Sequence, residues 1–428
     1  MQLPEDFKRE TRLVMGDERF NRFMGAFDEE APVSIRLNPR LHTPHSTLHT
    51  PHSTLLTPQE DIPWCEEGYY LAGRPQFTFD PLFHAGCYYV QEAASMFVTH
   101  IIRSVDIPTP KRALDLCAAP GGKSTALLSV LPDDCTLVSN EPISNRAQIL
   151  LENITKWGYP NSIVTNNYPR DYRKAKLTFD LILCDVPCSG EGMFRKDPAT
   201  IGEWSLQNVE KCWRLQREIV ADAWECLAPG GLLIYSTCTF NLKENEENVR
   251  WILGNFDAEV LDIPIDPSWN ITGSLLEGFT APVFRFIPGI TRSEGLFICA
   301  IRKRGARRED SFSRKEEGGR RNENTVIKEK LEKIKFLKVL DPSDLLPPSS
   351  FLLPRISIDY PEALKYLRGE ALVLPADTPR GIVNIAYKGI VLGAVKNIGN
   401  RANNLYPKAW RIRTTHLPTE EVKIIDIQ

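Results

Sequence analysis

The chain has 428 residues, of which 42% are hydrophobic and 25% charged, and its formal net charge at pH 7 is −3. This length predicts two or three domains, and the lack of any run of about 18 apolar residues excludes a membrane-spanning helix. The small net charge neither requires nor excludes a nucleic-acid partner, because a local basic surface would suffice.

Ten cysteines occur in the chain without C-x-x-C spacing or a closely clustered framework. We therefore expect reduced thiols rather than disulfides or zinc ligands. Residues 1–7 lack the basic and apolar regions of a secretion signal. Together these features predict a cytoplasmic protein without a metal or a membrane partner, and we expect it to be a monomer.

The sequence of residues 1–75 indicates a small N-terminal cap, which we expect to contribute to RNA binding. Apolar residues at helical spacing form a stripe, which consists of Phe7, Leu13, Met15, Phe20, Phe23 and Met24. The segment Val33–Leu37 then alternates as a strand does. Next, residues 42–48 recur letter for letter as residues 49–55, and they hold four of the seven histidines. Without a nearby cysteine or acid, this Pro-rich insert is interpreted as a solvated loop rather than a metal site.

Residues 76–303 predict a doubly wound, mostly parallel α/β sheet, because apolar strands alternate regularly with amphipathic helices. The expected strands lie near residues 113–117, 136–140, 162–166, 179–184 and 231–237. The expected helices lie near residues 91–104, 122–130, 143–157 and 206–227. A late pair, Ala258–Ile263 and Gly295–Ile301, is expected to close the sheet as an antiparallel edge.

Residues 304–330 are rich in both charges and almost free of apolar residues, which predicts a solvated linker rather than an RNA contact. Residues 331–428 then predict a separate β-rich domain. Its alternating runs are Gly381–Tyr387 and Ile390–Val395.

Two cysteines follow buried strands of the predicted sheet. Cys188 lies in Asp185-Val-Pro-Cys-Ser-Gly after the apolar run 181–184, and Cys238 lies in Ser-Thr-Cys-Thr after the run 232–235. Open α/β sheets bind their ligands at the carboxyl ends of the strands, so we expect both thiols in an active site. Either cysteine alone would be read as a small buried hydrophobe, but two at strand ends beside Asp185 indicate chemistry.

Another strand end carries a turn suited to a nucleotide-like cofactor. Residues 115–123 read Asp-Leu-Cys-Ala-Ala-Pro-Gly-Gly-Lys and match neither the dinucleotide motif nor the P-loop motif. The small residues let the backbone bend past a ligand, and amides at the next helix start could hold a carboxylate such as that of S-adenosylmethionine. Glu141 ends the following strand, where an acid binds ribose hydroxyls. The turn and the two thiols together indicate covalent methylation of a pyrimidine base.

These motifs resemble one family. Ala118-Ala119-Pro120-Gly121-Gly122-Lys123, followed by Asp185-x-Pro-Cys-Ser-Gly and Thr237-Cys238, is similar to the Sun/Fmu/NOL family of RNA cytosine-5 methyltransferases over roughly residues 30–303. With its cap and basic tail, the chain most resembles the bacterial 16S ribosomal RNA branch with a PUA-like C-terminal domain. The resemblance implies S-adenosylmethionine as cofactor and ribosomal RNA, possibly within a small ribosomal subunit, as partner.

The resemblance also implies catalytic roles. Cys238 would add to C6 of cytosine, which turns C5 into a carbon that can accept a methyl group. Cys188 would assist product release, Asp185 would bind the N3/N4 edge of the base, and Lys123 would point into the site. DNA cytosine-5 methyltransferases use the Pro-Cys thiol and need no second one, so Cys238 indicates an RNA substrate.

The same resemblance implies the cofactor contacts. The expected residues are Cys117, Ala118, Ala119, Pro120, Gly121, Gly122, Lys123, Glu141, Arg146, Asn167, Tyr168 and Asp185. Family members often carry an acid for the adenine end where this chain has Tyr168. A stacking or backbone contact is expected to replace it.

RNA contacts are expected on two segments, around a target nucleotide extruded into the pocket. The loop 190–198 is basic, and the tail between residues 393 and 413 interleaves cations with aromatic residues. Cations would bind phosphates, and Trp410 or Tyr406 would stack on a base. The predicted RNA-binding residues are Arg195, Lys196, Lys396, Arg401, Lys408, Trp410 and Arg411.

Two alternatives stay open: a transfer RNA cytosine-5 methyltransferase, and an RNA-binding ribosome assembly factor without essential catalysis. An amino-methyltransferase is disfavoured, because Cys188 stands where the stacking aromatic of its motif would be and Cys238 would be unexplained.

Overall fold

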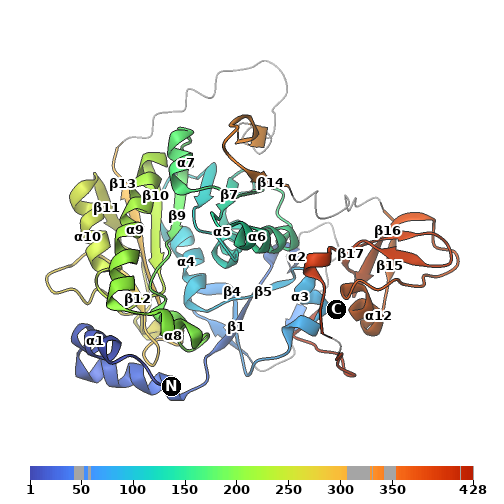
Figure 1. Ribbon diagram of the computed structural model, residues 1–428, viewed down its shortest axis with the longest axis horizontal. Coiled ribbons are helices and arrows are strands. Elements are labelled where there is room, and N and C mark those ends of the chain that lie inside the picture. The colour runs from blue at the N-terminus through green and yellow to red at the C-terminus, as the bar shows by residue number, and fades with distance from the viewer. Residues whose placement is uncertain are drawn as a thin grey trace.

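The computed structural model describes residues 1–42, 53–55, 59–305, 328–329, 331–341, 353–414 and 416–427. A large α/β sheet lies beside an N-terminal cap, and a small C-terminal sheet lies on the other side of the cap strands (Figure 1). The repeated segment is outside the described residues except for residues 42 and 53–55, and the predicted linker is outside them except for residues 304–305 and 328–329. The expected division into domains at residues 75, 303 and 330 stays a prediction.

The large sheet confirms the predicted α/β fold. Its five central strands are parallel neighbours: β10 (Leu227–Thr237), β9 (Phe179–Asp185), β6 (Arg112–Asp115), β7 (Thr136–Asn140) and β8 (Ser162–Thr165). Antiparallel strands flank them: β11 (Ala258–Leu261), β13 (Leu296–Lys303) and β12 (Phe284–Phe286) on one side, β14 (Val339–Leu340) on the other. The predicted antiparallel pair is β11 and β13. Strand β14 was not predicted, and it extends the large sheet rather than the C-terminal one.

Helices cover both faces of this sheet (Figure 1). One face packs against α4 (Phe97–Ser104), α5 (Gly122–Val130) and α6 (Ser144–Trp157), and the other against α7 (Pro169–Lys174), α9 (Leu206–Cys226) and α10 (Glu246–Asn255). Because side chains alternate along a strand, Leu181 and Leu183 of β9 face the first set while Ile182 and Cys184 face the second. Both faces are buried, which explains why these strands read as continuous apolar runs.

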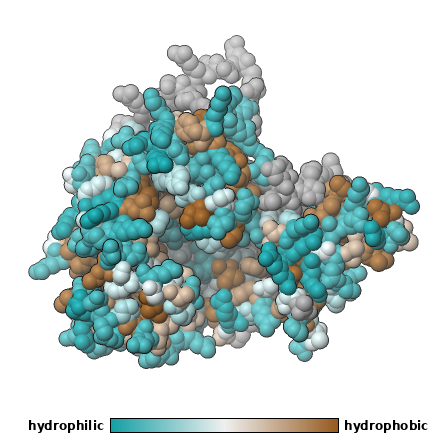
Figure 2. All heavy atoms as spheres, viewed as in Figure 1, coloured by the Kyte–Doolittle hydropathy of each residue, from teal (hydrophilic) through white to brown (hydrophobic). Residues whose placement is uncertain are grey.

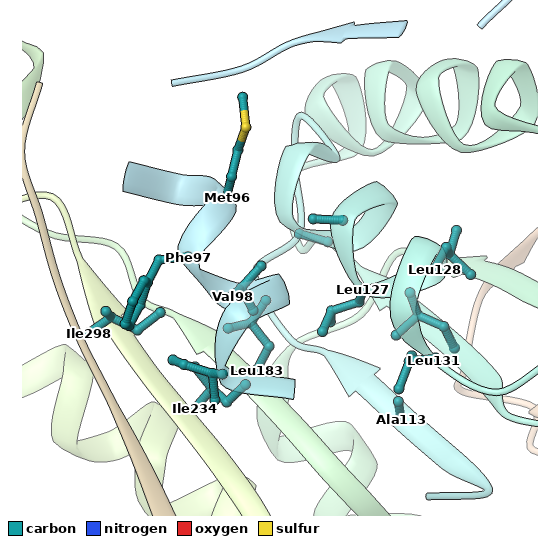
Figure 3. Close-up of a cluster of buried hydrophobic side chains, with 14 of the residues drawn as sticks. Met96, Phe97, Val98, Ala113, Leu127, Leu128, Leu131, Leu183, Ile234 and Ile298 are labelled. Atoms are coloured by element: carbon teal, nitrogen blue, oxygen red, sulfur yellow. The ribbon is translucent and has the colours of Figure 1, made fainter. Parts of the chain in front are cut away.

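The first core is seen from close by in Figure 3, where Phe97 and Val98 of α4 lie over Leu183, Ile234 and Ile298 of the strands. The shorter elements around the sheet are η3 (Ala94–Met96), η4 (Glu191–Met193), α8 (Ala199–Glu203) and η5 (Pro267–Trp269). No helix in the described part of the chain is long and apolar enough to cross a membrane.

The cap consists of helix α1 (Glu5–Gly25) and an antiparallel sheet. The sheet has the order β3 (Gln59–Ile62), β4 (Cys65–Leu71), β1 (Val33–Leu37) and β5 (Tyr88–Val90). Short elements complete it: η1 (Ala26–Asp28), α2 (Pro39–His42), η2 (Phe77–Phe79) and α3 (Pro81–His84), while β2 (Ser53–Leu55) pairs with β19 (Ile425–Ile427) near the other end of the chain.

Helix α1 supports the loops that follow β9 and β10. The ring centroids of Phe7 and Phe194 are 5.1 Å apart, and those of Phe23 and Phe240 are 4.9 Å apart. The prediction that Leu13 belongs to the buried stripe is wrong, since its side chain is 75% exposed. Phe7, Thr11 and Met15 define the buried face at intervals of four residues, and position 13 falls between them on the opposite side.

The C-terminal region confirms the expected β-rich structure. Its sheet has the order β15 (Arg355–Ser357), β16 (Gly381–Tyr387), β17 (Ile390–Asn397) and β18 (Ala402–Asn404), with α12 (Tyr360–Leu367) and η7 (Lys408–Trp410) beside it. Its buried residues join one core with those of the cap, for example Tyr366 and Val395 with Ile35 and Tyr88. Hydrophilic residues dominate the face in Figure 2, with hydrophobic residues in smaller groups between them.

Candidate active site

The ends of β9 and β10 bring the two predicted thiols together. Cys188 follows β9, Cys238 follows β10, and these strands are parallel neighbours. The Sγ atoms of Cys188 and Cys238 lie 3.3 Å apart, and both residues are half-buried. The contact with Cys238 and burial raise the pKa of the Cys188 thiol well above its ordinary value. Two sulfur atoms this close together can contact adjacent atoms of one bound ligand.

Lys123 and Asp185 form an ion pair at the same edge. Lys123 Nζ lies 2.8 Å from Asp185 Oδ2, and the Ser236 hydroxyl donates a hydrogen bond of 2.7 Å to Asp185 Oδ1. Burial alone would lower the pKa of the Lys123 ammonium, but the charge of Asp185 and the hydrogen bond to it outweigh burial and raise the pKa. The family resemblance implied both residues for the site, and the structure brings them within contact of each other.

The cofactor turn leads from β6 into α5. Gly121 adopts φ 114°, which side-chain-bearing residues rarely adopt, and a Cβ there would lie 3.2 Å from Leu150 Cδ1. From α6, Arg146 Nη2 donates to Ala119 O at 2.9 Å and Asn153 Nδ2 donates to Pro120 O at 2.8 Å. These contacts fix the turn and leave the amides at the start of α5 for a ligand.

The side chains after β7 and β8 have different surroundings. Glu141 is buried, accepts a hydrogen bond from Ile143 N and lies 3.4 Å from Arg146 Nη1. Asn167 exchanges two hydrogen bonds with the backbone of Lys338, which occupies its amide. Tyr168 is 57% exposed. The amides at the start of α5 suit a carboxylate and Glu141 suits ribose hydroxyls, so the residues present fit S-adenosylmethionine.

The cations predicted to bind RNA divide into two groups. Lys196, Lys396, Arg401 and Lys408 are exposed. Arg195 is instead engaged: its guanidinium pairs with Glu294 at 3.0 Å and donates to Glu29 O, and only 8% of its side chain is exposed. The guanidinium of Arg411 donates to Tyr406 O and packs against Gly369.

The expectation that Trp410 or Tyr406 stacks on a base is wrong. Both are buried, with exposures of 6% and 2%, in the core that the C-terminal sheet shares with the cap. Lys156 lies over the Trp410 ring at 5.2 Å from its centroid. Both rings pack in this core. The presence of an aromatic residue in a basic segment does not show whether its ring is buried or exposed.

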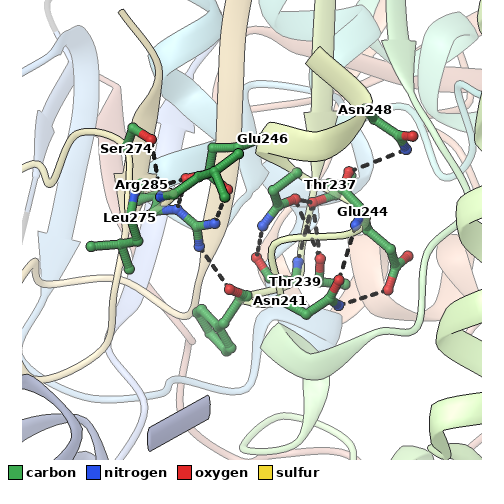
Figure 4. A network of polar contacts seen from close by, with 12 residues as sticks. Thr237, Thr239, Asn241, Glu244, Glu246, Asn248, Ser274, Leu275 and Arg285 are labelled. Atoms are coloured by element: carbon green, nitrogen blue, oxygen red, sulfur yellow. Dashed lines mark hydrogen bonds and ion pairs between the residues drawn. The ribbon is translucent and has the colours of Figure 1, made fainter. Parts of the chain in front are cut away.

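Several buried polar residues were missed by the sequence analysis. Asn140 joins the ends of three strands by donating to Leu116 O and Asn167 O and accepting from Thr165 Oγ1. In the loop after β10, Thr237 and Thr239 donate to Asn245 Oδ1, and Glu246 forms a buried pair with Arg285 (Figure 4). The available signal was the run of polar residues directly after a buried strand.

Within the described ranges, no group of three or more His, Cys, Asp or Glu side chains is placed to hold a metal ion. A doubly wound sheet with a glycine turn after its first parallel strand and an acid after the next defines a Rossmann-like cofactor fold. The turn lacks the dinucleotide motif and two thiols lie at neighbouring strand ends, which places the chain in the class of Rossmann-like methyltransferases.

Comparisons with known proteins identify the family. Residues 106–302 match the family described as 16S rRNA methyltransferase RsmB/F, residues 3–93 match the N-terminal domain of 16S rRNA methyltransferase RsmF, and residues 354–412 match the methyltransferase RsmF PUA domain. The chain therefore belongs to the RsmB/F methyltransferase family.

Curated relatives carry the name ribosomal RNA small subunit methyltransferase F. The protein from Serratia proteamaculans is 34% identical over 308 residues, which are 70% of this chain and 63% of the relative. The protein from Cronobacter sakazakii is 36% identical over 250 residues, which are 56% and 51%. The chain thus spans less than two thirds of the length of these relatives.

Solved structures share the fold. A methyltransferase homolog from Pyrococcus horikoshii aligns with a TM-score of 0.57 and 27% identity over 70% of this chain and 95% of its own. NSun6 from Pyrococcus horikoshii, solved with SFG, aligns with a TM-score of 0.57 and 20% identity over 71% and 99%.

Proposed function

We propose that this protein transfers a methyl group from S-adenosylmethionine to C5 of a cytosine in RNA, and that its substrate is 16S ribosomal RNA in the cytoplasm. The observation that carries the proposal is the pair of thiols of Cys188 and Cys238, 3.3 Å apart beside the ion pair of Lys123 and Asp185. The curated relatives, named as small subunit methyltransferases, support the choice of RNA.

Cys238 acts as the nucleophile in this proposal. Its sulfur forms a bond to C6 of the cytosine, the C5–C6 double bond is lost, and C5 becomes nucleophilic. After C5 has taken the methyl group, the C5 proton leaves, the S–C6 bond breaks and the double bond returns. The product is released and the Cys238 thiolate is regenerated.

Cys188 removes the C5 proton. In the free enzyme its contact with the Cys238 thiol is the largest cause of its raised pKa. When Cys238 is bonded to the base, that thiol contact is lost, Cys188 releases its thiol proton to solvent, and the resulting thiolate takes the proton from the adjacent C5. Positioned proton transfer of this kind contributes about 10²–10⁴-fold to a rate.

Asp185 holds the N3/N4 edge of the cytosine, and Lys123 holds Asp185. The ammonium of Lys123 and the hydroxyl of Ser236 each bind one oxygen of the Asp185 carboxylate, which fixes the plane of that group. A carboxylate fixed in this way can orient the base while electron density shifts within the ring.

The cofactor would be held by the turn 117–123, by Glu141 and by Asp185. When bound, S-adenosylmethionine supplies an electrophilic methyl group. The exposed cations Lys196, Lys396, Arg401 and Lys408 would bind the RNA phosphates around a flipped nucleotide.

The test is bisulfite sequencing of total RNA from cells with and without the gene, followed by transfer of labelled methyl groups to naked 16S RNA and to small subunits by the purified protein. A single protected cytosine that is lost from 16S RNA is the expected result. Loss from a transfer RNA would keep the chemistry and overturn the substrate. Cofactor binding without methyl transfer to any RNA would overturn the enzyme and favour an assembly factor.

A further inference from the structure

The two thiols lie on separate loops, and a buried glutamate of each loop accepts hydrogen bonds from the backbone of the other loop. Glu191 belongs to the loop of Cys188, and its Oε2 accepts hydrogen bonds from Phe240 N at 2.6 Å and Asn241 N at 3.1 Å in the loop of Cys238. Glu244 belongs to the loop of Cys238, and it accepts from the backbone N of Ser189 at 3.0 Å, directly after Cys188. The crossing is reciprocal.

The two carboxylates share a partner. The side-chain amide of Asn241 donates to Glu191 Oε1 at 3.0 Å and to Glu244 Oε1 at 2.9 Å. We call Glu191, Asn241 and Glu244 the carboxylate clasp. The backbone adds one further link, since Gly192 N donates to Cys238 O at 2.6 Å and a Cβ at Gly192 would lie 2.7 Å from that oxygen.

Every acceptor position of the clasp is used. Besides the bonds already named, Glu191 accepts from Trp204 Nε1 at 3.1 Å, and Glu244 accepts from Ser189 Oγ at 2.5 Å and Gln216 Nε2 at 2.6 Å. Each carboxylate therefore accepts four hydrogen bonds, and the exposures of Glu191 and Glu244 are only 2% and 0%. Two buried acids side by side are costly unless fully bonded, whereas an apolar contact would hold the loops together without fixing their register.

We propose that Glu191 and Glu244 are positioning residues that set the separation of the Cys188 and Cys238 sulfur atoms. The effect of this separation on catalysis rests on the proposed function. In that function one sulfur attacks C6 and the other serves the adjacent C5. Each thiol therefore needs a fixed position relative to the other, although they are on separate loops. Neither glutamate touches a reacting atom.

Substitution by glutamine tests the clasp at constant size. In Glu244→Gln and Glu191→Gln, a side-chain NH₂ group replaces one acceptor and faces a donor, so the loops must separate locally. A misplacement of about 1 Å can cost about 10²-fold in rate. We expect kcat for RNA methylation to fall by about 10–100-fold in each variant with KM nearly unchanged, and Glu244→Asp to recover part of the loss.

A second measurement does not depend on methylation. The azo oxidant diamide takes two electrons and two protons from a thiol pair, which form an S–S bond, and peptide mapping reports the Cys188–Cys238 disulfide. In the wild type the sulfur atoms already touch, so this pair is expected to react first. Both glutamine variants should form it at least about tenfold more slowly. Cys188→Ser, which cannot form it, identifies the signal.

Two further variants make the result decisive. Glu210→Gln is the matched control, because Glu210 also holds the Cys238 loop, through Lys243 at 2.6 Å, but at the surface, and it should behave as wild type. Ser189→Ala removes one bond to Glu244 without burying a mismatched group, so it should fold and cross-link more slowly than wild type even where the glutamine variants are unstable.

If the glutamine variants fold and form the disulfide at the wild-type rate, the positioning role of Glu191 and Glu244 is refuted. If the glutamine variants do not fold, a wild-type rate in Ser189→Ala refutes it. Slower cross-linking combined with a wild-type protein that methylates no RNA would overturn the proposed function and leave the clasp standing.

Discussion

The sulfur atoms of Cys188 and Cys238 are in contact at 3.3 Å although 50 residues separate them along the chain. The register of β9 and β10 explains this contact, because Tyr235 pairs with Cys184 and Ser236 with Asp185, so both strands end at the same level. The two loops leave the sheet side by side, and each carries its thiol a few residues later.

Removing the nucleophile is expected to abolish turnover without affecting the cofactor. Cys238→Ala should lower methyl transfer by several orders of magnitude, because the thiol that the proposed mechanism adds to C6 is then absent. Its dissociation constant for S-adenosylmethionine, measured by calorimetry, should stay within about twofold of the wild type, since the cofactor turn follows a different strand. Substantial turnover in this variant would reject Cys238 as the nucleophile.

Removing the second thiol is expected to trap an intermediate. In Cys188→Ala the S–C6 bond still forms, but the C5 proton has no base and the enzyme stays bonded to RNA. A slowly migrating protein–RNA band should accumulate in denaturing gels when cofactor is present. The double variant Cys188→Ala/Cys238→Ala is the control and should show no band. If Cys188→Ala shows no such band, Cys188 does not assist product release.

Lys123 is expected to matter for the rate more than for RNA binding. Lys123→Met removes the ammonium and leaves Asp185 with the Ser236 hydroxyl as its side-chain partner in the described part of the chain, so the carboxylate loses its fixed orientation. We expect single-turnover methylation at saturating cofactor to slow by about 10²-fold, with little change in RNA affinity. A variant that methylates at the wild-type rate would show that the ion pair is only structural.

The sequence predicted the backbone of this site well and its buried polar contacts poorly. Strand patterns locate Cys188, Cys238 and Glu141, because the parallel-sheet rule needs only local information. The backbone partners of Glu191 and Glu244 in the opposite loop, Phe240 and Ser189, lie 49 and 55 residues away. Tyr406 likewise meets the cap, since its hydroxyl lies 3.5 Å from Nδ1 of His84, 322 residues earlier, in a contact that no local pattern encodes.

The buried acid at the end of β6 is expected to make stability depend on pH. Burial raises the pKa of Asp115 to about 7, partly opposed by a hydrogen bond from Ser124. Because the folded state keeps the proton to higher pH than the unfolded state, the free energy of unfolding falls as pH rises from about 4 to about 7. Asp115→Asn should flatten this slope by up to about 1.4 kcal/mol per pH unit.

Urea unfolding of wild type and Asp115→Asn between pH 5 and 8 checks this prediction. The Asn variant should gain stability relative to the wild type as pH rises, because the wild type must then bury a charge. A difference between the two proteins that stays constant with pH would show that Asp115 titrates normally in the fold.

The C-terminal cations are best tested by point substitution, because the C-terminal sheet shares its core with the cap and truncation at residue 331 would expose that core. Replacing exposed Lys396, Arg401 and Lys408 by alanine should weaken RNA binding. If each binds one phosphate, the slope of log affinity against log salt should fall by about 2. Removing the exposed Lys174, Lys333 and Lys335 instead, which also takes away three positive charges, should leave the slope unchanged. Filter binding across a salt series measures the slopes of both variants and of the wild type. If the variant without Lys396, Arg401 and Lys408 has the wild-type slope, these cations do not bind RNA phosphates.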